Sequence, residues 1–166
     1  LGEGRVAKHS LRVEAVGEVD EATAALGLAR AVSQAAQTRP LLLQAQRHLY
    51  ALMAELSATP ENAARFKSIG NEAVNWLEHQ TNALSALVEM PNEFILPGDS
   101  PSGAAMAIAR TIVRRAERRV AQLLHSGELE NANLLRYLNR LSSLCFVLEL
   151  LENQNSGISR PSLAKA

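Results

Sequence analysis

Apolar residues recur at intervals of three and four along most of the chain, a spacing typical of amphipathic helices. The helices predicted from this spacing cover, in order, residues 18–36, 42–56, 69–88, 101–125 and 134–151. A further short helical turn is expected in the polar connection that follows the second helix. No stretch shows the strict alternation of a strand, and the intervening loops are short. The pattern therefore predicts an all-α, up-down bundle of five helices.

Two segments outside this periodicity frame the bundle. Residues 1–17 contain glycines and bases with little apolar spacing, and we predict a loop there. Residues 154–166 are polar and interrupted by Gly157 and Pro161, which predicts a loosely held end. The 166 residues are 47% hydrophobic, enough for one core. We therefore expect one domain, residues 1–166, with the bundle over residues 18–153.

The balance of charges narrows the function classes. Lysine plus arginine and aspartate plus glutamate each number 17, whereas a nucleic-acid module usually carries net positive charge. Cys145 is the only cysteine, so an internal disulfide is impossible and a reducing, cytoplasmic location is the simplest expectation. We see no apolar run of membrane-spanning length and no signal peptide. Neither a nucleic-acid partner nor a membrane is expected.

The most unusual local feature is a concentration of arginine behind a Pro-Gly turn. Ser100 is a good N-cap and Pro101 occupies the first helical position, where its missing N–H costs nothing. Small residues follow, so another group can approach the first turn closely. The helix then carries Arg110, Arg114, Arg115, Arg118 and Arg119, with Glu117 among them. These cations repel one another unless anions or carboxylates neutralise them, and composition favours a solvated or salt-bridged helix face about as much as a site for a small anion such as a nucleotide. The rigid Pro-Gly turn and the small residues before the arginines favour the anion site.

Other candidate chemistry is sparse. The histidines are scattered and no Glu-x-x-His pair exists, so the sequence predicts no protein-built metal site. Residue spacing reveals no nucleophile–base pair, and the sequence contains no intact Walker loop. Arg5 and Lys8 form a flexible basic string suited to phosphates, although such strings are common. Asp20 and Glu21 fit a helix N-terminus through the dipole and are also candidates to pair with the arginines.

Together these strings resemble one family, the PduO-type ATP:cob(I)alamin adenosyltransferases. The matching strings, in the family's order, are GRVAK at 4–8, RVEAVGEVDE at 12–21, LGLAR at 26–30, FILPG at 94–98, ARTIVRRAERR at 109–119 and LNRLSSL at 138–144. GEVDE alone is weak, whereas FILPG followed by the arginine string is highly specific.

The resemblance implies a five-helix bundle that assembles as a homotrimer with active sites between subunits. Such an enzyme transfers the adenosyl group of ATP to the cobalt of cob(I)alamin and releases triphosphate, with Mg²⁺ required. Reduced cobalt is itself the nucleophile, which accounts for the lack of a protein nucleophile. A reductase and adenosylcobalamin-dependent enzymes are possible partners.

The resemblance also assigns residues. Those matching the ATP site are Lys8, Arg114, Arg115, Glu117, Arg118 and Asn139. Asp20 and Arg110 match a salt bridge between subunits that shapes the site, and Phe94 matches the aromatic residue against the lower face of the corrin. From the residues alone, the favoured interpretation of Asn139 and Arg140 is a pair of polar residues on the helix surface. Catalysis is expected to depend most on Arg114, Phe94, Asp20 and Arg110.

Two departures from the family pattern keep an alternative open. The family's Thr- and Gly-rich ATP loop lies upstream of GRVAK, so we expect it outside this sequence, and Asp99 stands where the family usually has glycine. The alternative is a non-catalytic trimeric bundle that binds ATP or a corrinoid as a carrier or regulator.

Overall fold

A computed structural model describes residues 5–59 and 61–165. Gly4 of the predicted phosphate-contacting string and Pro60 of the predicted polar connection lie outside these residues. The helices are α1 (Leu11–Val32), α2 (Thr38–Ser57), α3 (Ala63–Phe66), α4 (Asn71–Ser85), α5 (Pro101–His125) and α6 (Ala132–Asn155). Five of them are long and α3 is the short turn expected after the second helix. The all-α, five-helix prediction is confirmed.

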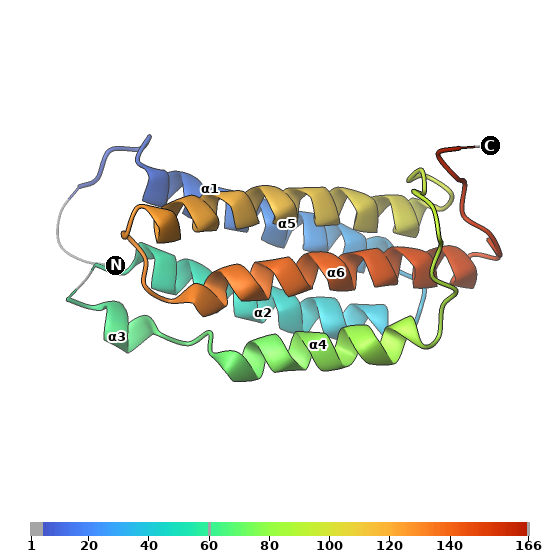
Figure 1. Ribbon diagram of the computed structural model, residues 1–166, viewed down its shortest axis with the longest axis horizontal. Helices are drawn as coiled ribbons and strands as arrows, with labels where there is room; N and C mark the ends of the chain where they lie inside the picture. Colours follow the sequence, from blue (N-terminus) through green and yellow to red (C-terminus); the bar gives the residue numbers. More distant parts are fainter. Residues whose placement is uncertain (1–4, 60, 166) are drawn as a thin grey trace.

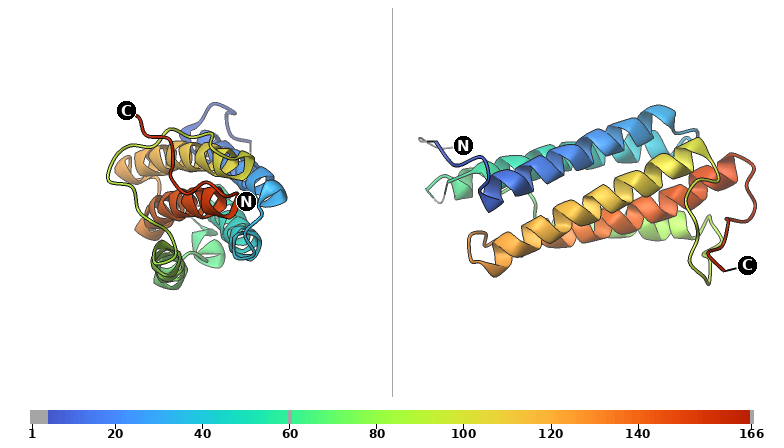
Figure 2. Two further views of the ribbon diagram at one scale, coloured as in Figure 1. Left: turned by 90° about the vertical axis from the view of Figure 1, so that its right-hand side faces the viewer. Right: turned by 90° about the horizontal axis from the view of Figure 1, so that it is seen from above.

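The long helices alternate in direction along the chain and lie roughly parallel to one axis (Figure 1). α5 packs against both α1 and α6, while α2 packs on α1 and α4 packs on α6. The end-on and top views of Figure 2 show the same arrangement, with one connection crossing an end of the bundle between α4 and α5. α5, the arginine helix, is thus central to the packing. One of its sides faces α1 and another faces α6.

α1 begins earlier than the sequence predicts. The loop expected over residues 1–17 ends at Ser10, whose hydroxyl accepts a hydrogen bond from the Val13 amide at 3.4 Å. Ala15 and Val19 are fully buried, so this first part of α1 contributes to the core. Gly17 obscures the helical pattern, but it lies on the exposed side and no atom approaches the position of an added Cβ. The helix therefore tolerates it.

α2 also begins earlier, at Thr38, within the segment predicted to break the helix. Pro40 falls in the first turn, where a backbone N–H has no partner inside the helix and its absence costs nothing. The buried carboxylate of Glu152 on α6 is the hydrogen-bond acceptor at this end of α2. It accepts hydrogen bonds from the amides of Gln34 and Ala35 at 2.9 and 3.2 Å and from the Thr38 hydroxyl at 2.5 Å. A charge on α6 thus fixes the α1–α2 turn.

The start of α5 is locked against α6. The Ser100 hydroxyl accepts from the Gly103 amide at 2.9 Å, which confirms Ser100 as the N-cap, and donates to Asn153 Oδ1 at 2.6 Å. A Cβ on Gly103 would lie 2.1 Å from Asn153 Oδ1, so only glycine fits there. The small residue Gly103 therefore makes room at this turn for the side chain of Asn153 from the same chain. The C-terminal end of α5 follows prediction, with Gly127 at a φ of 76° just after it.

The C-terminal tail is not loosely held. α6 continues to Asn155, and the tail then returns along the segment before α5. The Leu96 amide donates to the Ser162 carbonyl at 2.7 Å, and the Ala164 amide donates to the Phe94 carbonyl at 2.8 Å. These bonds surround an antiparallel bridge between Ile95 and Leu163. The prediction was wrong because this pairing is non-local and depends on backbone groups.

The core is made largely of leucine and alanine from the long helices, with Tyr137 its largest fully buried side chain. Cys145 lies in this core, as expected for a small hydrophobe, and burial raises the pKa of its thiol to about 12. Among the described helices, none combines the length and apolar character that crossing a bilayer requires.

Candidate functional site

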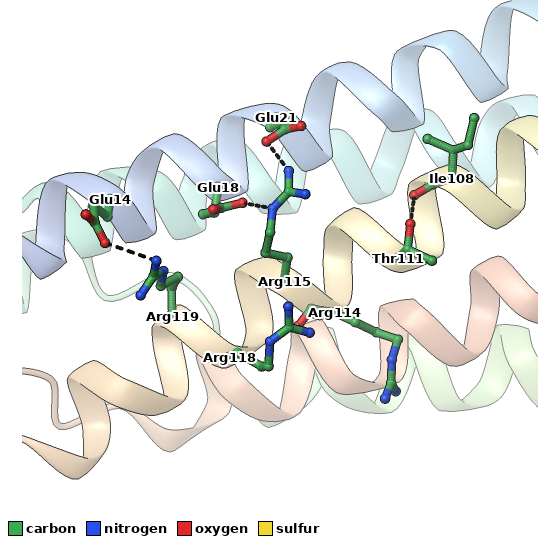
Figure 3. Close-up of polar contacts among 9 residues, drawn as sticks. All are labelled: Glu14, Glu18, Glu21, Ile108, Thr111, Arg114, Arg115, Arg118 and Arg119. Carbon is green, nitrogen blue, oxygen red and sulfur yellow. Dashed lines mark hydrogen bonds and ion pairs between the residues drawn. The ribbon is translucent and has the colours of Figure 1, made fainter.

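Two arginines of α5 are neutralised by α1. Arg115 donates from Nε to Glu18 at 2.6 Å and from Nη2 to Glu21, and these hydrogen bonds raise the pKa of its guanidinium. One turn further on, Arg119 Nη2 lies 3.4 Å from a Glu14 carboxylate oxygen. Figure 3 shows both side chains directed at α1. Asp20 and Glu21 were predicted as candidate carboxylate partners of the arginines, and Glu21 is such a partner within this chain.

Two other arginines lack such partners. Arg114 and Arg118 are exposed, and among residues 5–59 and 61–165 no carboxylate forms an ion pair with either. The contact recorded for Arg118 is a donation to the Arg114 carbonyl at 3.2 Å. Arg114 points away from α1 in Figure 3. These two guanidinium groups, one turn apart, are the part of the cluster that remains available to an external anion.

Glu117 and Asn139 lie beside these free arginines and contact each other. The Asn139 amide donates to Glu117 Oε1 at 2.8 Å, joining α5 to α6. Asn139 is exposed and Glu117 is half-buried. Arg140, like Asn139, is exposed on the helix surface, as the residues alone favoured, and it pairs with Glu78 of α4 at 2.9 Å. The structure therefore brings together four of the predicted ATP-site residues: Arg114, Glu117, Arg118 and Asn139.

Arg110 lies further toward the start of α5 and faces α6. Its Nε is 4.0 Å from Glu149 Oε2, beyond hydrogen-bonding distance, and its guanidinium carbon lies 5.9 Å from the centre of the Phe146 ring. Burial raises the pKa of Glu149, and the Arg110 charge opposes that rise. Asp20 is exposed on α1 and forms no recorded ion pair within the described chain. The predicted pairing of Asp20 with Arg110 is not made inside one subunit.

Phe94 is 88% exposed, which is exceptional for a phenylalanine, and lies before α5 at the end of the bundle that also holds the tail. Arg5 and Lys8 are exposed in the segment before α1, at the opposite end (Figure 1). α5 has 25 residues and so spans about 37 Å between these ends. One chain therefore does not bring Phe94, Arg114 and Lys8 together.

A groove of about 540 Å³ adjoins the Phe94 end. The segment after α4 forms one wall, with Met90 and Pro91, while the last turns of α6 and the tail complete it, with Leu150 and Leu163.

No group of three or more histidine, cysteine, aspartate or glutamate side chains suited to a metal ion occurs in the part of the chain that the structure describes.

Glu14 and Glu18 are the contacts that sequence reasoning missed. Glu14 was placed in the predicted loop and Glu18 at the first position of the predicted helix, so their spacing of four was not recognised as helical. On an antiparallel helix, acids four residues apart face arginines four residues apart, so Glu14 and Glu18 match Arg119 and Arg115. The same spacing in the sequence was the signal that could have revealed them. Asp99 was also missed, because its partner Ser162 is distant in sequence.

Comparisons with known proteins agree on one family. The family model described as cobalamin adenosyltransferase matches residues 1–152. A corrinoid adenosyltransferase of Bacillus subtilis is 40% identical over 159 residues, covering 93% of this chain and 81% of that protein. The corrinoid adenosyltransferase PduO of Salmonella typhimurium is 35% identical and is covered over 45% of its length, with 92% of this chain aligned.

A solved structure extends the likeness to three dimensions. It is a phenylalanine-to-alanine variant of a PduO-type ATP:corrinoid adenosyltransferase from Lactobacillus reuteri, complexed with cobalamin and ATP. The TM-score is 0.87 at 30% identity, over 99% of this chain and 92% of that one. An arginine-to-lysine variant of the enzyme from the same organism, complexed with ATP, gives a TM-score of 0.86 at 28% identity over 96% and 90%.

Proposed function

Because this chain belongs to the cobalamin adenosyltransferase family, and is by homology an ATP:corrinoid adenosyltransferase, we propose that the free arginines of α5 bind the triphosphate of ATP. One observation carries this assignment. Arg115 and Arg119 are neutralised by α1, whereas Arg114 and Arg118 have no carboxylate partner among the described residues. Two exposed guanidinium groups one turn apart can each give a phosphate two parallel hydrogen bonds.

The reaction needs this charge more at its transition state than before it. The cobalt of cob(I)alamin attacks the ribose carbon, so that a cobalt–carbon bond forms while the carbon–oxygen bond to triphosphate breaks. The electron pair leaves with the triphosphate, whose negative charge grows. Fixed cations at that position stabilise the departing group. Arg114 and Arg118 therefore contribute electrostatically, and the protein supplies no nucleophile.

The remaining ATP-site residues have supporting roles. Glu117 and Asn139 hold each other at 2.8 Å beside the free arginines, a pairing that fixes one edge of the site. Arg5 and Lys8 supply further cations from the segment before α1. Arg115 is already held by Glu18 and Glu21, so it contributes by positioning α1 against the site. Mg²⁺ enters as the ATP complex, with the phosphates as its main ligands and Glu117 as the nearest acid of the cluster.

We place the corrin against Phe94. An aromatic side chain that is 88% exposed packs against little of its own subunit, and an apolar ligand would cover it. Against the lower face of the corrin it would keep an axial ligand away from cobalt, which makes the metal easier to reduce.

The separation of Phe94 from Lys8 along the bundle favours a site shared between subunits of a homotrimer. The α1–α5 side of the molecule supports such an assembly because it exposes apolar Leu28 and Ile108, at 55% and 52%. It also leaves Asp20 without a partner. Asp20 of one subunit pairing with Arg110 of the next would give Asp20 a cation and Arg110 a second carboxylate besides Glu149, which lies 4.0 Å away, and loss of Arg110 would leave Asp20 buried and unpaired.

The proposal is tested by comparing Arg114→Ala with Arg119→Ala. Both remove an arginine from α5, but Arg119 already has a carboxylate partner, Glu14. With ATP, Mg²⁺ and chemically reduced cobalamin, adenosylcobalamin formation is followed by its absorption spectrum. We expect Arg114→Ala to lower kcat/KM by about 100-fold or more, the usual loss for one charge-stabilising donor. Arg119→Ala should change it by less than about threefold, since exposed ion pairs contribute little. Equal losses would contradict the division between free and neutralised arginines.

A further inference from the structure

We infer that Asp99 is a positioning residue for Phe94, acting through a clasp on the C-terminal tail. Its carboxylate accepts two hydrogen bonds from one residue of the tail. The Ser162 amide donates to Oδ2 at 2.9 Å and the Ser162 hydroxyl donates to Oδ1 at 2.7 Å. Hydrogen bonds to an ionised carboxylate are stronger than those between neutral groups. This inference rests on the corrin role proposed for Phe94.

Next to the clasp, the segment before α5 forms an isolated antiparallel bridge with the tail, between Ile95 and Leu163. On one side of Ile95, the Leu96 amide donates to the Ser162 carbonyl at 2.7 Å. On the other, the Ala164 amide donates to the Phe94 carbonyl at 2.8 Å. Asp99, Leu96 and Phe94 therefore hold the tail at three successive points. The backbone of Phe94 is fixed by a segment that arrives from the far end of the chain.

Phe94 needs this external support because its own side chain offers none. At 88% exposure it packs against little of the protein, so its position depends on its backbone. The backbone between Phe94 and α5 includes Gly98 at a φ of 128°, a conformation that side-chain-bearing residues rarely adopt. Pairing with the tail limits the freedom that such a turn would otherwise allow.

Asp99 is well placed to act as the anchor of the clasp. It immediately precedes Ser100, whose hydroxyl is bonded both to the Gly103 amide and to the buried Asn153. The carboxylate thus projects from the most firmly held point of this end of the bundle. In the amino-acid sequence, Asp99 stands out only as a departure from the glycine usual in the family. In this chain the departure supplies a side chain that a glycine cannot.

Amide hydrogen exchange of the full-length protein tests the clasp without any substrate. In Asp99→Ala, the amides of Leu96 and Ala164 should exchange about tenfold faster than in the wild type, because the bridge between the two segments opens more often. Ser162→Ala removes the hydroxyl that donates to Asp99 and should accelerate the exchange of these amides less, because the Ser162 amide still donates to Asp99. Ser159→Ala, an exposed change in the same tail, is the matched control and should leave these amides unchanged. Unchanged exchange in Asp99→Ala would overturn the clasp.

Steady-state kinetics then test positioning. Asp99→Ala should raise the KM for cob(I)alamin at least about threefold while the KM for ATP stays within error, because only the corrin contact depends on Phe94. Asp99→Asn, which retains one acceptor oxygen, should recover part of the loss. Faster exchange with both KM values unchanged would show that the clasp exists but does not position Phe94, and would overturn the inference. Because the exchange experiment needs no corrinoid, failure of the clasp is distinguishable from failure of the proposed site.

Discussion

Substituting Gly103 by alanine tests how α5 is seated on α6. An added Cβ would lie 2.1 Å from Oδ1 and 2.8 Å from Cγ of Asn153, and 2.9 Å from the Ser100 hydroxyl. Asn153 is only 4% exposed and accepts from Ser100, so moving it breaks that bond inside the protein. Overpacking costs about 1–3 kcal/mol and a lost internal hydrogen bond about 1 kcal/mol more. We expect Gly103→Ala to lower the free energy of unfolding by about 2–4 kcal/mol.

The matched control is Gly17→Ala on α1. Gly17 is also helical, but no atom lies within 4 Å of its added Cβ. Alanine there should stabilise the protein by about 0.5–1 kcal/mol through the unfolded chain. Thermal unfolding followed by circular dichroism, at one fixed protein concentration, should place Gly103→Ala about 5–15 °C below the wild type. Equal Tm values for the two variants would refute the steric argument.

Two further changes probe buried polar groups. Glu152→Ala should cost about 3 kcal/mol in urea unfolding, because two amides and the Thr38 hydroxyl lose a buried acceptor. Glu152→Gln, which keeps one oxygen, should cost clearly less; equal losses would contradict the capping role. Burial lowers the pKa of His48 below its usual 6.5. The folded state therefore resists its protonation, so its contribution is full above pH 6.5 and declines as the pH falls below that value. The urea midpoint should drop between pH 7.5 and 5.5, and less so in His48→Gln; equal drops would exclude His48 as the cause.

The sequence predicts the bundle well because long apolar faces repeat over many turns. α4, α5 and α6 carry such faces, and their existence and order follow from spacing alone. Helix starts are harder to predict. α1 and α2 both begin among residues that weaken local helical preference, Gly17 and Pro40, and packing or capping from elsewhere compensates. In α2 the compensating group is Glu152, more than a hundred residues away.

The candidate site, like the fold, could be predicted from local sequence patterns only in part. The family resemblance assigns residues to the ATP site, and in the structure Arg118 contacts Arg114 on α5 while Glu117 of α5 contacts Asn139 of α6. What spacing alone does not predict is which arginines are already neutralised. That depends on how α1 is aligned with α5, and therefore on recognising that the helix extends back from Glu18 through Glu14. The clasp of Asp99 on Ser162 joins segments 63 residues apart and has no local signature.

Helical geometry explains why one chain neutralises only part of its arginine cluster. Neighbouring residues on a helix are turned by about 100°, so the side of α5 carrying Arg115 and Arg119 differs from the side carrying Arg114 and Arg118. α1 covers the first side and has no reach to the second. The same rule applies to α1 itself. Glu18 faces α5, and Asp20, two residues on, is turned by about 200° and points away. The unpaired cations and the unpaired Asp20 are thus consequences of a single packing. Each remains accessible to a partner from outside the chain, and the partners proposed above are a polyphosphate for Arg114 and Arg118 and a cation of another subunit for Asp20.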